Sequence, residues 1–308
     1  MTEVPDSKYA SRHADVDAEA YYRRGRETMN AVIDRTGHHP LDGYHPLAWR
    51  HYTRRLALLD RLSGIDFESA LDVGCAEGYF MAVIAQARGA EMWGVDFSDR
   101  AVTVAASKYG FPVAAAQATA LPFADGAFDL VYSTEVIEHV LDPAAMLAEM
   151  RRVSRRHVLV TTPVSQSDHQ HEPDYGVRVT GHVNDFDEAA VRRLFGPHAD
   201  LRTFRCNATW ALLTFGRRLP PRPRDFFYRL DHRVAKRFGS PHGKLVPLRN
   251  RDWMIVAEGA GGGPAPREWR CPLCHGKLTA DAEALRCSRD EVSFGLVAPG
   301  VPDLFTPR

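Results

Sequence analysis

Short apolar runs alternate with amphipathic segments through the middle of the chain. The amphipathic segments carry apolar residues at every third or fourth position, the period of a helix that packs on one side. This alternation predicts an α/β fold, in which helices cover both faces of a doubly wound, mostly parallel sheet. The predicted strands are residues 70–73, 91–95, 112–116, 128–133 and 156–161, and the predicted helices are residues 79–88, 99–108, 143–153 and 187–195.

Two later apolar runs, around residues 206–215 and 253–258, predict an antiparallel pair at the edge of this sheet. Between them lies a basic insertion, residues 216–252, with eleven Lys or Arg against three Asp. Its centre, residues 226–238, predicts an amphipathic basic helix that suits RNA, a phosphate-bearing substrate or an anionic membrane surface. The alternative is a solvated face that covers an edge of the sheet.

The two ends of the chain differ from this middle part. Residues 1–66 lack strand periodicity and are rich in aromatic residues and histidine. They predict an N-terminal helical lid with a loop at residues 38–46, or helices whose rings simply pack onto the sheet. Residues 259–267 have the composition of a flexible linker. The predicted domains are therefore residues 1–66, a central domain at 67–258, the linker and a small module at 268–308.

Composition bears on the domain size, the charge and the cellular location of the protein. A chain of 308 residues can form one main domain with additions. The formal net charge of zero gives no overall attraction to nucleic acid or membrane, so any such attraction must be local. The polar first ten residues and the absence of a run long enough to cross a bilayer predict a cytoplasmic protein.

The segment L-D-V-G-C-A-E-G, residues 71–78, joins a buried strand to a helix through a glycine turn. Glycines at such a turn let the backbone pass close to a ligand. Asp96 ends the next strand, about 20 residues further on, where a carboxylate can accept hydrogen bonds from both hydroxyls of a ribose. This arrangement predicts a cradle for a nucleotide cofactor.

Four further motifs follow this loop in order: Q-A-T-A-L-P-F at 117–123, F-D-L-V at 128–131, E-V-I-E-H-V at 135–140 and V-L-V-T-T-P at 158–163. Together the five motifs resemble the class I S-adenosylmethionine-dependent methyltransferases, whose loop usually reads D-x-G-x-G-x-G. Ala76 replaces the middle glycine, and Gln117 stands where the family commonly has an acid. The resemblance implies S-adenosylmethionine as cofactor, bound by Asp72, Gly74, Ala76, Gly78, Asp96, Phe97, Gln117, Ala118, Thr119 and Thr134.

The E-V-I-E-H-V motif supplies the candidate catalytic residues. Glu135, Glu138 and His139 follow the strand at 128–133, and positions i, i+3 and i+4 of a helix share one face. We therefore expect the three side chains to converge at the carboxyl edge of the sheet, with His182 closing the same site. The motif resembles those of ubiquinone-biosynthesis O-methyltransferases and of 2′-O-methyltransferases acting on small RNAs. That resemblance implies a divalent ion, such as Mg²⁺, held by Glu135, Glu138, His139 and His182; the alternative is a site without metal, where His139 is a base or a packing residue.

The C-terminal module carries three cysteines at zinc-ribbon spacing, Cys271, Cys274 and Cys287. Asp290 stands where a fourth cysteine is expected, and His275 is a less regular substitute. The module resembles the small zinc-ribbon-like proteins related to the activator subunit of tRNA and translation-factor methyltransferases. We expect it to bind Zn²⁺ or to be a metal-free β-module, and to pack against the central domain or help present the substrate.

These observations predict a methyltransferase that modifies a hydroxyl of a small or medium-sized metabolite. RNA 2′-O-methylation, C- or N-methylation of a metabolite, and a non-enzymatic scaffold that keeps the cofactor fold remain open alternatives. The sequence names neither the acceptor nor the oligomeric state.

Overall fold

A seven-stranded sheet forms the centre of the protein. The computed structural model describes residues 16–36, 48–164, 182–205, 251–281, 283–305 and 307. In this part of the chain the strand order is β3-β2-β1-β4-β5-β7-β6, with β1 to β5 parallel and β7 antiparallel to both β5 and β6. The strands are β1 (Ser69–Val73), β2 (Glu91–Asp96), β3 (Val113–Ala115), β4 (Phe128–Thr134), β5 (Ser154–Pro163), β6 (Asp200–Arg205) and β7 (Arg251–Glu258).

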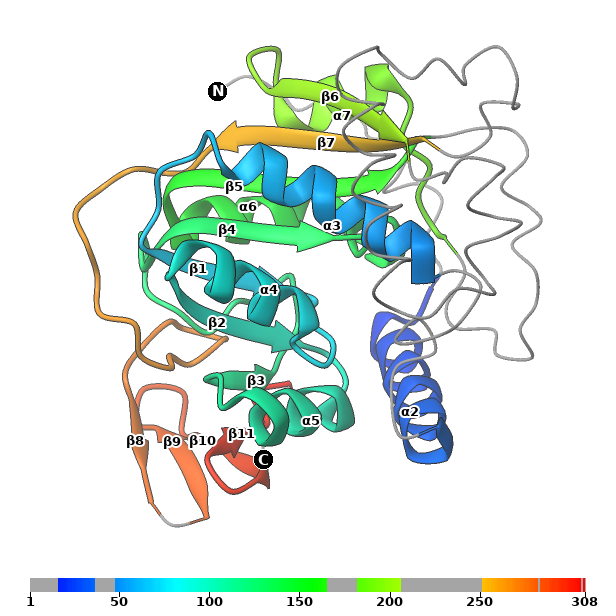
Figure 1. Ribbon diagram of the computed structural model, residues 1–308. Coiled ribbons are helices and arrows are strands. Elements are labelled where there is room, and N and C mark those ends of the chain that lie inside the picture. The colour runs from blue at the N-terminus through cyan, green and yellow to red at the C-terminus, as the bar shows by residue number, and fades with distance from the viewer. Residues whose placement is uncertain are drawn as a thin grey trace.

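Most helices pack on this sheet, and the described helix nearest the N-terminus, α2 (Ala18–Thr36), lies beyond the carboxyl ends of the parallel strands (Figure 1). Polar caps fix several helix starts, since the side chains of Ser98, Asp142 and Asp187 each accept a hydrogen bond from a backbone N–H of the first turn. The helices are α2 (Ala18–Thr36), α3 (Ala48–Leu62), α4 (Tyr79–Arg88), α5 (Asp99–Tyr109), α6 (Pro143–Val153) and α7 (Glu188–Phe195), with a 3₁₀ helix η1 (Ile137–His139). None of the helices in the described ranges is long and apolar enough to span a membrane.

The α/β fold and the mostly parallel sheet are confirmed, and the predicted elements between residues 70 and 195 lie within two residues of the observed ones at each end. The closing antiparallel pair is also present, but its first strand is β6 at residues 200–205, earlier than the predicted run. β6 is an edge strand whose only apolar residues are Leu201 and Phe204, so it has no continuous apolar run to mark it. Residues 206–215 and most of the basic insertion lie outside the described residues, as do the loops at 38–46 and 165–178.

The C-terminal module forms its own antiparallel sheet of β8 (Leu278–Ala280), β9 (Ala284–Cys287), β10 (Val292–Ala298) and β11 (Val301–Pro302). It packs against the central domain, as expected from the sequence: the Trp269 ring lies 5.0 Å from that of Trp93 and 5.1 Å from that of Phe123. Cys271 and Phe294 belong to the same buried cluster as the central strands. The module therefore shares its hydrophobic core with the domain, next to β2 and β3 (Figure 1).

The predicted linker is hydrogen-bonded where it begins. Gly259 N–H donates to Arg156 O and Ala260 N–H donates to Ser154 O, at 2.9 Å each. A Cβ atom on Gly259 would lie 2.4 Å from Ser154 O, so this position accepts only glycine. The first residues of the linker thus continue β7 along the sheet, which composition alone does not reveal.

Candidate active site

The glycine turn after β1 has the shape of a ligand cradle. Gly74, Ala76 and Gly78 all have positive φ, at 84°, 45° and 76°. A Cβ on Gly74 would lie 2.3 Å from Val136 Cγ2, so no larger residue fits there. Ala76 adopts a left-handed conformation that costs an L-residue free energy, and its N–H donates to Asp96 Oδ2 at 2.9 Å. The departure from the usual glycine at this position leaves the turn intact.

Asp96 ends β2 beside this turn. Its Oδ1 accepts a hydrogen bond from Ser98 N–H at 2.8 Å, and only 8% of the residue is exposed. Burial raises the pKa of Asp96 to about 6, against the lowering effect of its backbone hydrogen bonds. The side chain is thus held by backbone donors on both oxygens, at the strand end where sequence reasoning placed the ribose.

Asp72 lies beneath the cradle at the end of β1. Its Oδ2 accepts a hydrogen bond from the Tyr132 hydroxyl at 2.8 Å, while Oδ1 is buried and has no hydrogen-bond partner among the described residues. Burial, and secondarily the nearby charge of Asp96, raises the pKa of Asp72 to about 8. A buried polar atom without a partner calls for an explanation, and a donor supplied by a ligand is one.

The remaining predicted cofactor residues lie at the same edge of the sheet. Phe97 follows Asp96 and packs against the cluster of Met29, Ile33 and Ala101. Gln117, Ala118 and Thr119 form a half-buried turn shortly after β3, and Thr134 ends β4. The structure therefore places all ten predicted residues along the carboxyl ends of β1 to β4.

Three of the four predicted catalytic residues come together. Ligand-capable atoms of Glu138, His139 and His182, the acid–histidine cluster, lie within 4.8 Å of one another. The two imidazole rings are 4.9 Å apart between centroids, and His139 Nε2 lies 4.0 Å from Glu138 Oε1. Glu138 is 1% exposed, and burial raises its pKa to about 8.

The local backbone explains how the acid–histidine cluster forms. The carbonyl of Glu138 accepts hydrogen bonds from the N–H groups of Val183 and Asn184, at 2.9 and 3.0 Å. The buried Asn184 side chain also donates to the carbonyls of Ile137 and Val140, at 3.2 and 2.6 Å. These bonds fix the segment that carries His182 onto η1, which carries Glu138 and His139.

Glu135 does not join the cluster, contrary to the expectation from helical spacing. Its φ of 58° reverses the backbone before η1, so Glu135, Glu138 and His139 do not share one helical face. Its carboxylate instead accepts hydrogen bonds from Arg54 Nη2 at 2.7 Å and Thr161 Oγ1 at 3.1 Å. The turn at Glu135 and the 3₁₀ helix η1 thus stand where a regular helix was expected.

Arg54 is the main residue of this site that sequence reasoning missed. It comes from α3, is 3% exposed, and pairs with Glu135 and with Asp252 of β7, whose Oδ2 lies 2.6 Å from Arg54 Nη2. No local pattern marks a buried arginine on an amphipathic helix. Tyr132 was also missed, although it stands opposite Asp72 in the parallel register of β1 and β4, so the register would have suggested it.

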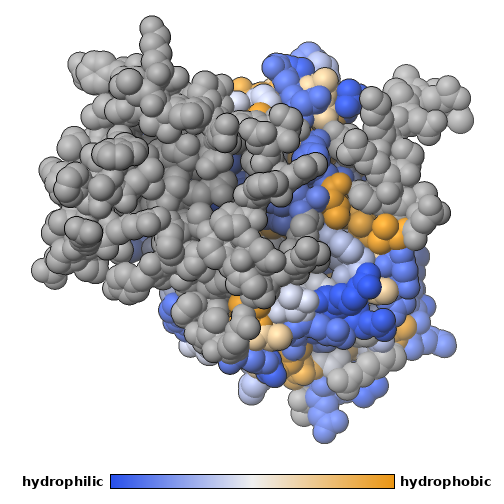
Figure 2. Space-filling view, turned by 90° about the vertical axis from the view of Figure 1, so that its right-hand side faces the viewer, coloured by the Kyte–Doolittle hydropathy of each residue, from blue (hydrophilic) through white to orange (hydrophobic). Residues whose placement is uncertain are grey.

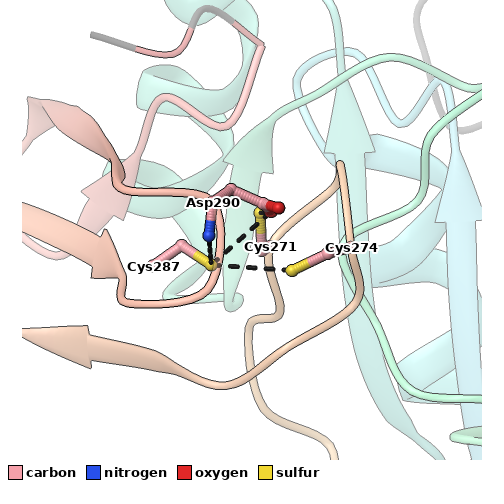
Figure 3. A group of neighbouring side chains, drawn as sticks. All are labelled: Cys271, Cys274, Cys287 and Asp290. Atoms are coloured by element: carbon pink, nitrogen blue, oxygen red, sulfur yellow. Dashed lines mark hydrogen bonds between the residues drawn. The ribbon is translucent and has the colours of Figure 1, made fainter.

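A second group of metal-ligand side chains, the cysteine cluster, consists of Cys271, Cys274, Cys287 and Asp290 (Figure 3). Cys271 Sγ lies 3.0 Å from Asp290 Oδ2, and Cys274 Sγ lies 3.6 Å from Cys287 Sγ. All four ligand atoms fall within 4.8 Å of one another, so Asp290 rather than His275 completes the group.

The surface on the side of the strand ends is mostly hydrophilic where it is described (Figure 2). Val16 and Leu273, at 38% and 58% exposed, are the large exposed hydrophobic residues among those described. The described surface thus offers no broad apolar patch.

Comparison with known proteins agrees with this geometry. Residues 71–160 match a family model described as a methyltransferase domain. This part of the chain is therefore similar to a methyltransferase domain, in agreement with the resemblance of its sequence motifs. The match does not extend to the C-terminal module, whose resemblance to a zinc ribbon remains a prediction.

Curated relatives of the methyltransferase domain include O-methyltransferases. O-methyltransferase cnsE of Penicillium expansum is 36% identical over 116 residues, covering 35% of this chain and 42% of that protein. The ubiquinone biosynthesis O-methyltransferase of Aromatoleum aromaticum is 34% identical over 123 residues, covering 38% of this chain and 49% of that protein. The chain thus spans less than half the length of these two relatives.

Among solved structures, magnesium protoporphyrin IX methyltransferase from Synechocystis PCC 6803, with bound S-adenosylhomocysteine, is similar in fold. The TM-score is 0.52 at 15% sequence identity, over 78% of this chain and 100% of that one. At this identity the likeness supports the methyltransferase fold and nothing about the substrate.

Asp72 gives a test of the buried site that needs no ligand. Because the folded-state pKa is raised from 3.8 to about 8, the folded protein keeps a proton that the unfolded chain loses above about pH 4. The contribution of this group to stability therefore falls as pH rises from about 4 to 8. Asp72→Asn cannot ionise, so its free energy of unfolding should rise relative to wild type by an amount on the order of 4 kcal/mol between pH 5 and pH 8. Urea unfolding of both proteins at the two pH values measures the difference, and a constant difference would contradict the raised pKa.

Proposed function

We propose that the protein is an S-adenosylmethionine-dependent methyltransferase that acts on a hydroxyl group of a small or medium-sized metabolite. The observation that carries this proposal is the placement of two sites at one edge of the sheet. The cradle and Asp96 lie at the ends of β1 and β2, and the acid–histidine cluster follows β4, which is the other neighbour of β1. A cofactor held by the first site would face an acceptor held by the second.

The described residues fit the cofactor. The cradle has the backbone conformation that lets a ligand approach, Asp96 suits the two ribose hydroxyls, and Asp72 offers a buried carboxyl group whose Oδ1 has no partner among the described residues. When bound, the cofactor supplies an electrophilic methyl group on a sulfonium. Orientation of donor and acceptor by the protein would supply most of the rate enhancement.

An acceptor hydroxyl must lose its proton, and the acid–histidine cluster is suited to take it. The His139 side chain is 31% exposed, so it can contact an acceptor, and it is next to the buried Glu138 carboxyl. A histidine in such a place acts as a general base near neutral pH. Glu138 accepts a hydrogen bond from Thr162 Oγ1 at 3.1 Å, which holds its carboxyl group in place.

The same cluster fits a divalent ion. Glu138, His139 and His182 offer one carboxylate and two imidazoles, and Glu138 Oε1 accepts no hydrogen bond from the described residues. Two imidazoles suit Mn²⁺, Fe²⁺ or Zn²⁺ better than Mg²⁺, which prefers oxygen ligands. Such an ion would acidify a bound hydroxyl. Glu135 would remain paired with Arg54 and outside the ligand set.

The alternatives have less support. RNA 2′-O-methylation was motivated by the basic insertion, nearly all of which lies outside the described residues, whereas the relative named for ubiquinone biosynthesis favours a small-molecule acceptor. For C- or N-methylation we find no specific observation in the described residues. The scaffold hypothesis rests on Ala76 and Gln117, and Ala76 keeps the cradle and its hydrogen bond to Asp96.

In the C-terminal module we propose a structural Zn²⁺ site formed by the cysteine cluster. Three thiolates and one carboxylate, all within 4.8 Å of one another, are donors that Zn²⁺ accepts, with the carboxylate in place of the usual fourth Cys or His. Burial and the hydrogen bond to Asp290 raise the pKa of Cys271 to about 12, so zinc must displace a proton and its binding should weaken at low pH.

Titration with S-adenosylhomocysteine tests the cofactor site. Wild type should bind with a micromolar dissociation constant, and Asp96→Ala should weaken binding by about tenfold or more because both ribose hydrogen bonds are lost. Glu91→Gln is the matched control, since Glu91 begins the same strand at its opposite end and is exposed. Absence of binding by wild type would reject the proposed activity.

The active-site ion is tested by titrating Mn²⁺ into the S-adenosylhomocysteine complex. His182→Asn should weaken Mn²⁺ binding by about tenfold or more while leaving S-adenosylhomocysteine affinity within about twofold. Calorimetry measures both constants. Equal Mn²⁺ affinity in the two proteins would remove the ion from the proposal and leave His139 as an unassisted base.

Metal content tests the cysteine cluster. Wild type should retain one zinc per chain after exhaustive dialysis, and Cys274→Ser should lose it. Asp290→Cys should bind zinc at least about tenfold more tightly in competition with a chelator, because a thiolate is the softer donor. Mass spectrometry of the intact protein counts the zinc, and a wild-type protein that never binds zinc would show the module to be metal-free.

A further inference from the structure

Arg26 of α2 joins three parts of the chain that are distant in sequence. Its Nη1 and Nη2 donate to the two carboxylate oxygens of Asp303, at 3.2 and 3.0 Å, and its Nε donates to Asp99 Oδ1 at 3.1 Å. The guanidinium carbon also lies 5.1 Å from the centroid of the Phe305 ring. Such a bidentate pair fixes orientation as well as distance.

Asp303 is itself firmly placed. It follows β11, its N–H donates to Gly295 O at 2.8 Å, and it forms a parallel bridge with Ala115 of β3. The next residue, Leu304, is 2% exposed and donates its N–H to Ala115 O at 2.7 Å. The C-terminal module thus extends the β3 edge of the main sheet, directly before the turn of Gln117 to Thr119 (Figure 1).

The same face of α2 reaches the candidate ribose-binding acid. Asn30, one helical turn after Arg26, accepts a hydrogen bond from Ser98 Oγ at 2.8 Å. Ser98 N–H in turn donates to Asp96 Oδ1. Two hydrogen bonds therefore connect α2 to Asp96, and Arg26 connects α2 to the C-terminal module.

The first turn of α2 reaches the acid–histidine cluster. The Tyr21 hydroxyl donates to His139 O at 2.9 Å, and the Tyr22 hydroxyl accepts from Leu141 N–H at 3.0 Å. Among the described residues, Met29 and Ile33 of α2 pack with Ala101 and its neighbours in a small cluster that is separate from the two main cores. The polar contacts of Tyr21, Tyr22, Arg26 and Asn30 therefore contribute to its placement.

From this geometry we propose that the C-terminal module is an internal brace: through Asp303 and Arg26 it holds α2 against Asp96 and η1, and so positions the cofactor site. Asp303 and Arg26 are positioning residues, because neither touches the cradle. The effect on cofactor affinity rests on the proposed function, whereas the effect on α2 does not.

Asp303→Asn tests the brace, because it removes the charge and keeps the size of the side chain. Amide hydrogen exchange in α2 should become at least about threefold faster, and S-adenosylhomocysteine affinity should fall about three- to tenfold. In turnover with an acceptor, KM for the cofactor should rise while kcat stays within about twofold. Asp303→Glu, which keeps the carboxylate, should restore most of the wild-type protection.

Asp281→Asn is the matched control. Asp281 is also an acid of the C-terminal module, paired with Arg286 and 45% exposed, and none of its hydrogen bonds or ion pairs within the described part of the chain reaches α2. It should leave exchange in α2 and cofactor affinity unchanged.

Unchanged exchange in α2 of the Asp303→Asn protein would overturn the proposal. So would faster exchange spread evenly over β8 to β11, because that would show a general loss of module stability. If wild type fails to bind S-adenosylhomocysteine, the proposed function is rejected, and the exchange of α2 alone then decides whether the brace exists.

Discussion

The structure around the site depends on keeping carboxyl groups buried at one edge of the sheet. Asp72, Asp96, Glu138 and Asp252 are each 8% exposed or less. An isolated charge in such a place is costly, so each group needs a partner or must keep its proton. Asp96 accepts hydrogen bonds from backbone N–H groups, Asp72 from the Tyr132 hydroxyl, and Glu138 from the Thr162 hydroxyl. Asp252 forms an ion pair with Arg54.

This requirement gives the N-terminal helices a role beyond covering the sheet. α3 supplies the buried guanidinium that neutralises Asp252 and holds Glu135, and α2 supplies the hydroxyl and amide groups that contact η1 and Ser98. Removal of one member of a buried charge pair is strongly destabilising, since it leaves the other member unpaired. The helices and the site are therefore parts of one polar network, and the C-terminal module is linked to it through Arg26.

The two candidate metal sites differ in how far local sequence defines them. Cys271 and Cys274 are neighbours in one turn, and Cys287 and Asp290 repeat that spacing, so two local pairs only need to face each other. The acid–histidine cluster needs His182, and the segment that carries it is held to η1 by hydrogen bonds from Val183 and Asn184. Glu135 has the right spacing for a helical face, but the reversed backbone turns it toward Arg54 instead.

The sequence by itself determined what depends on local pattern. The spacing of hydrophobic residues predicted the helices and most strands between residues 70 and 195. The glycine turn and Asp96 located the cradle, and the spacing of the cysteines located the cysteine cluster. Only the tertiary structure decided which distant side chains meet. Arg54 contacts Glu135 and Asp252 across 81 and 198 positions, and Arg26 contacts Asp303 across 277. Such contacts follow from how the elements pack, and packing brings together residues whose own neighbourhoods in the sequence carry no sign of the partner.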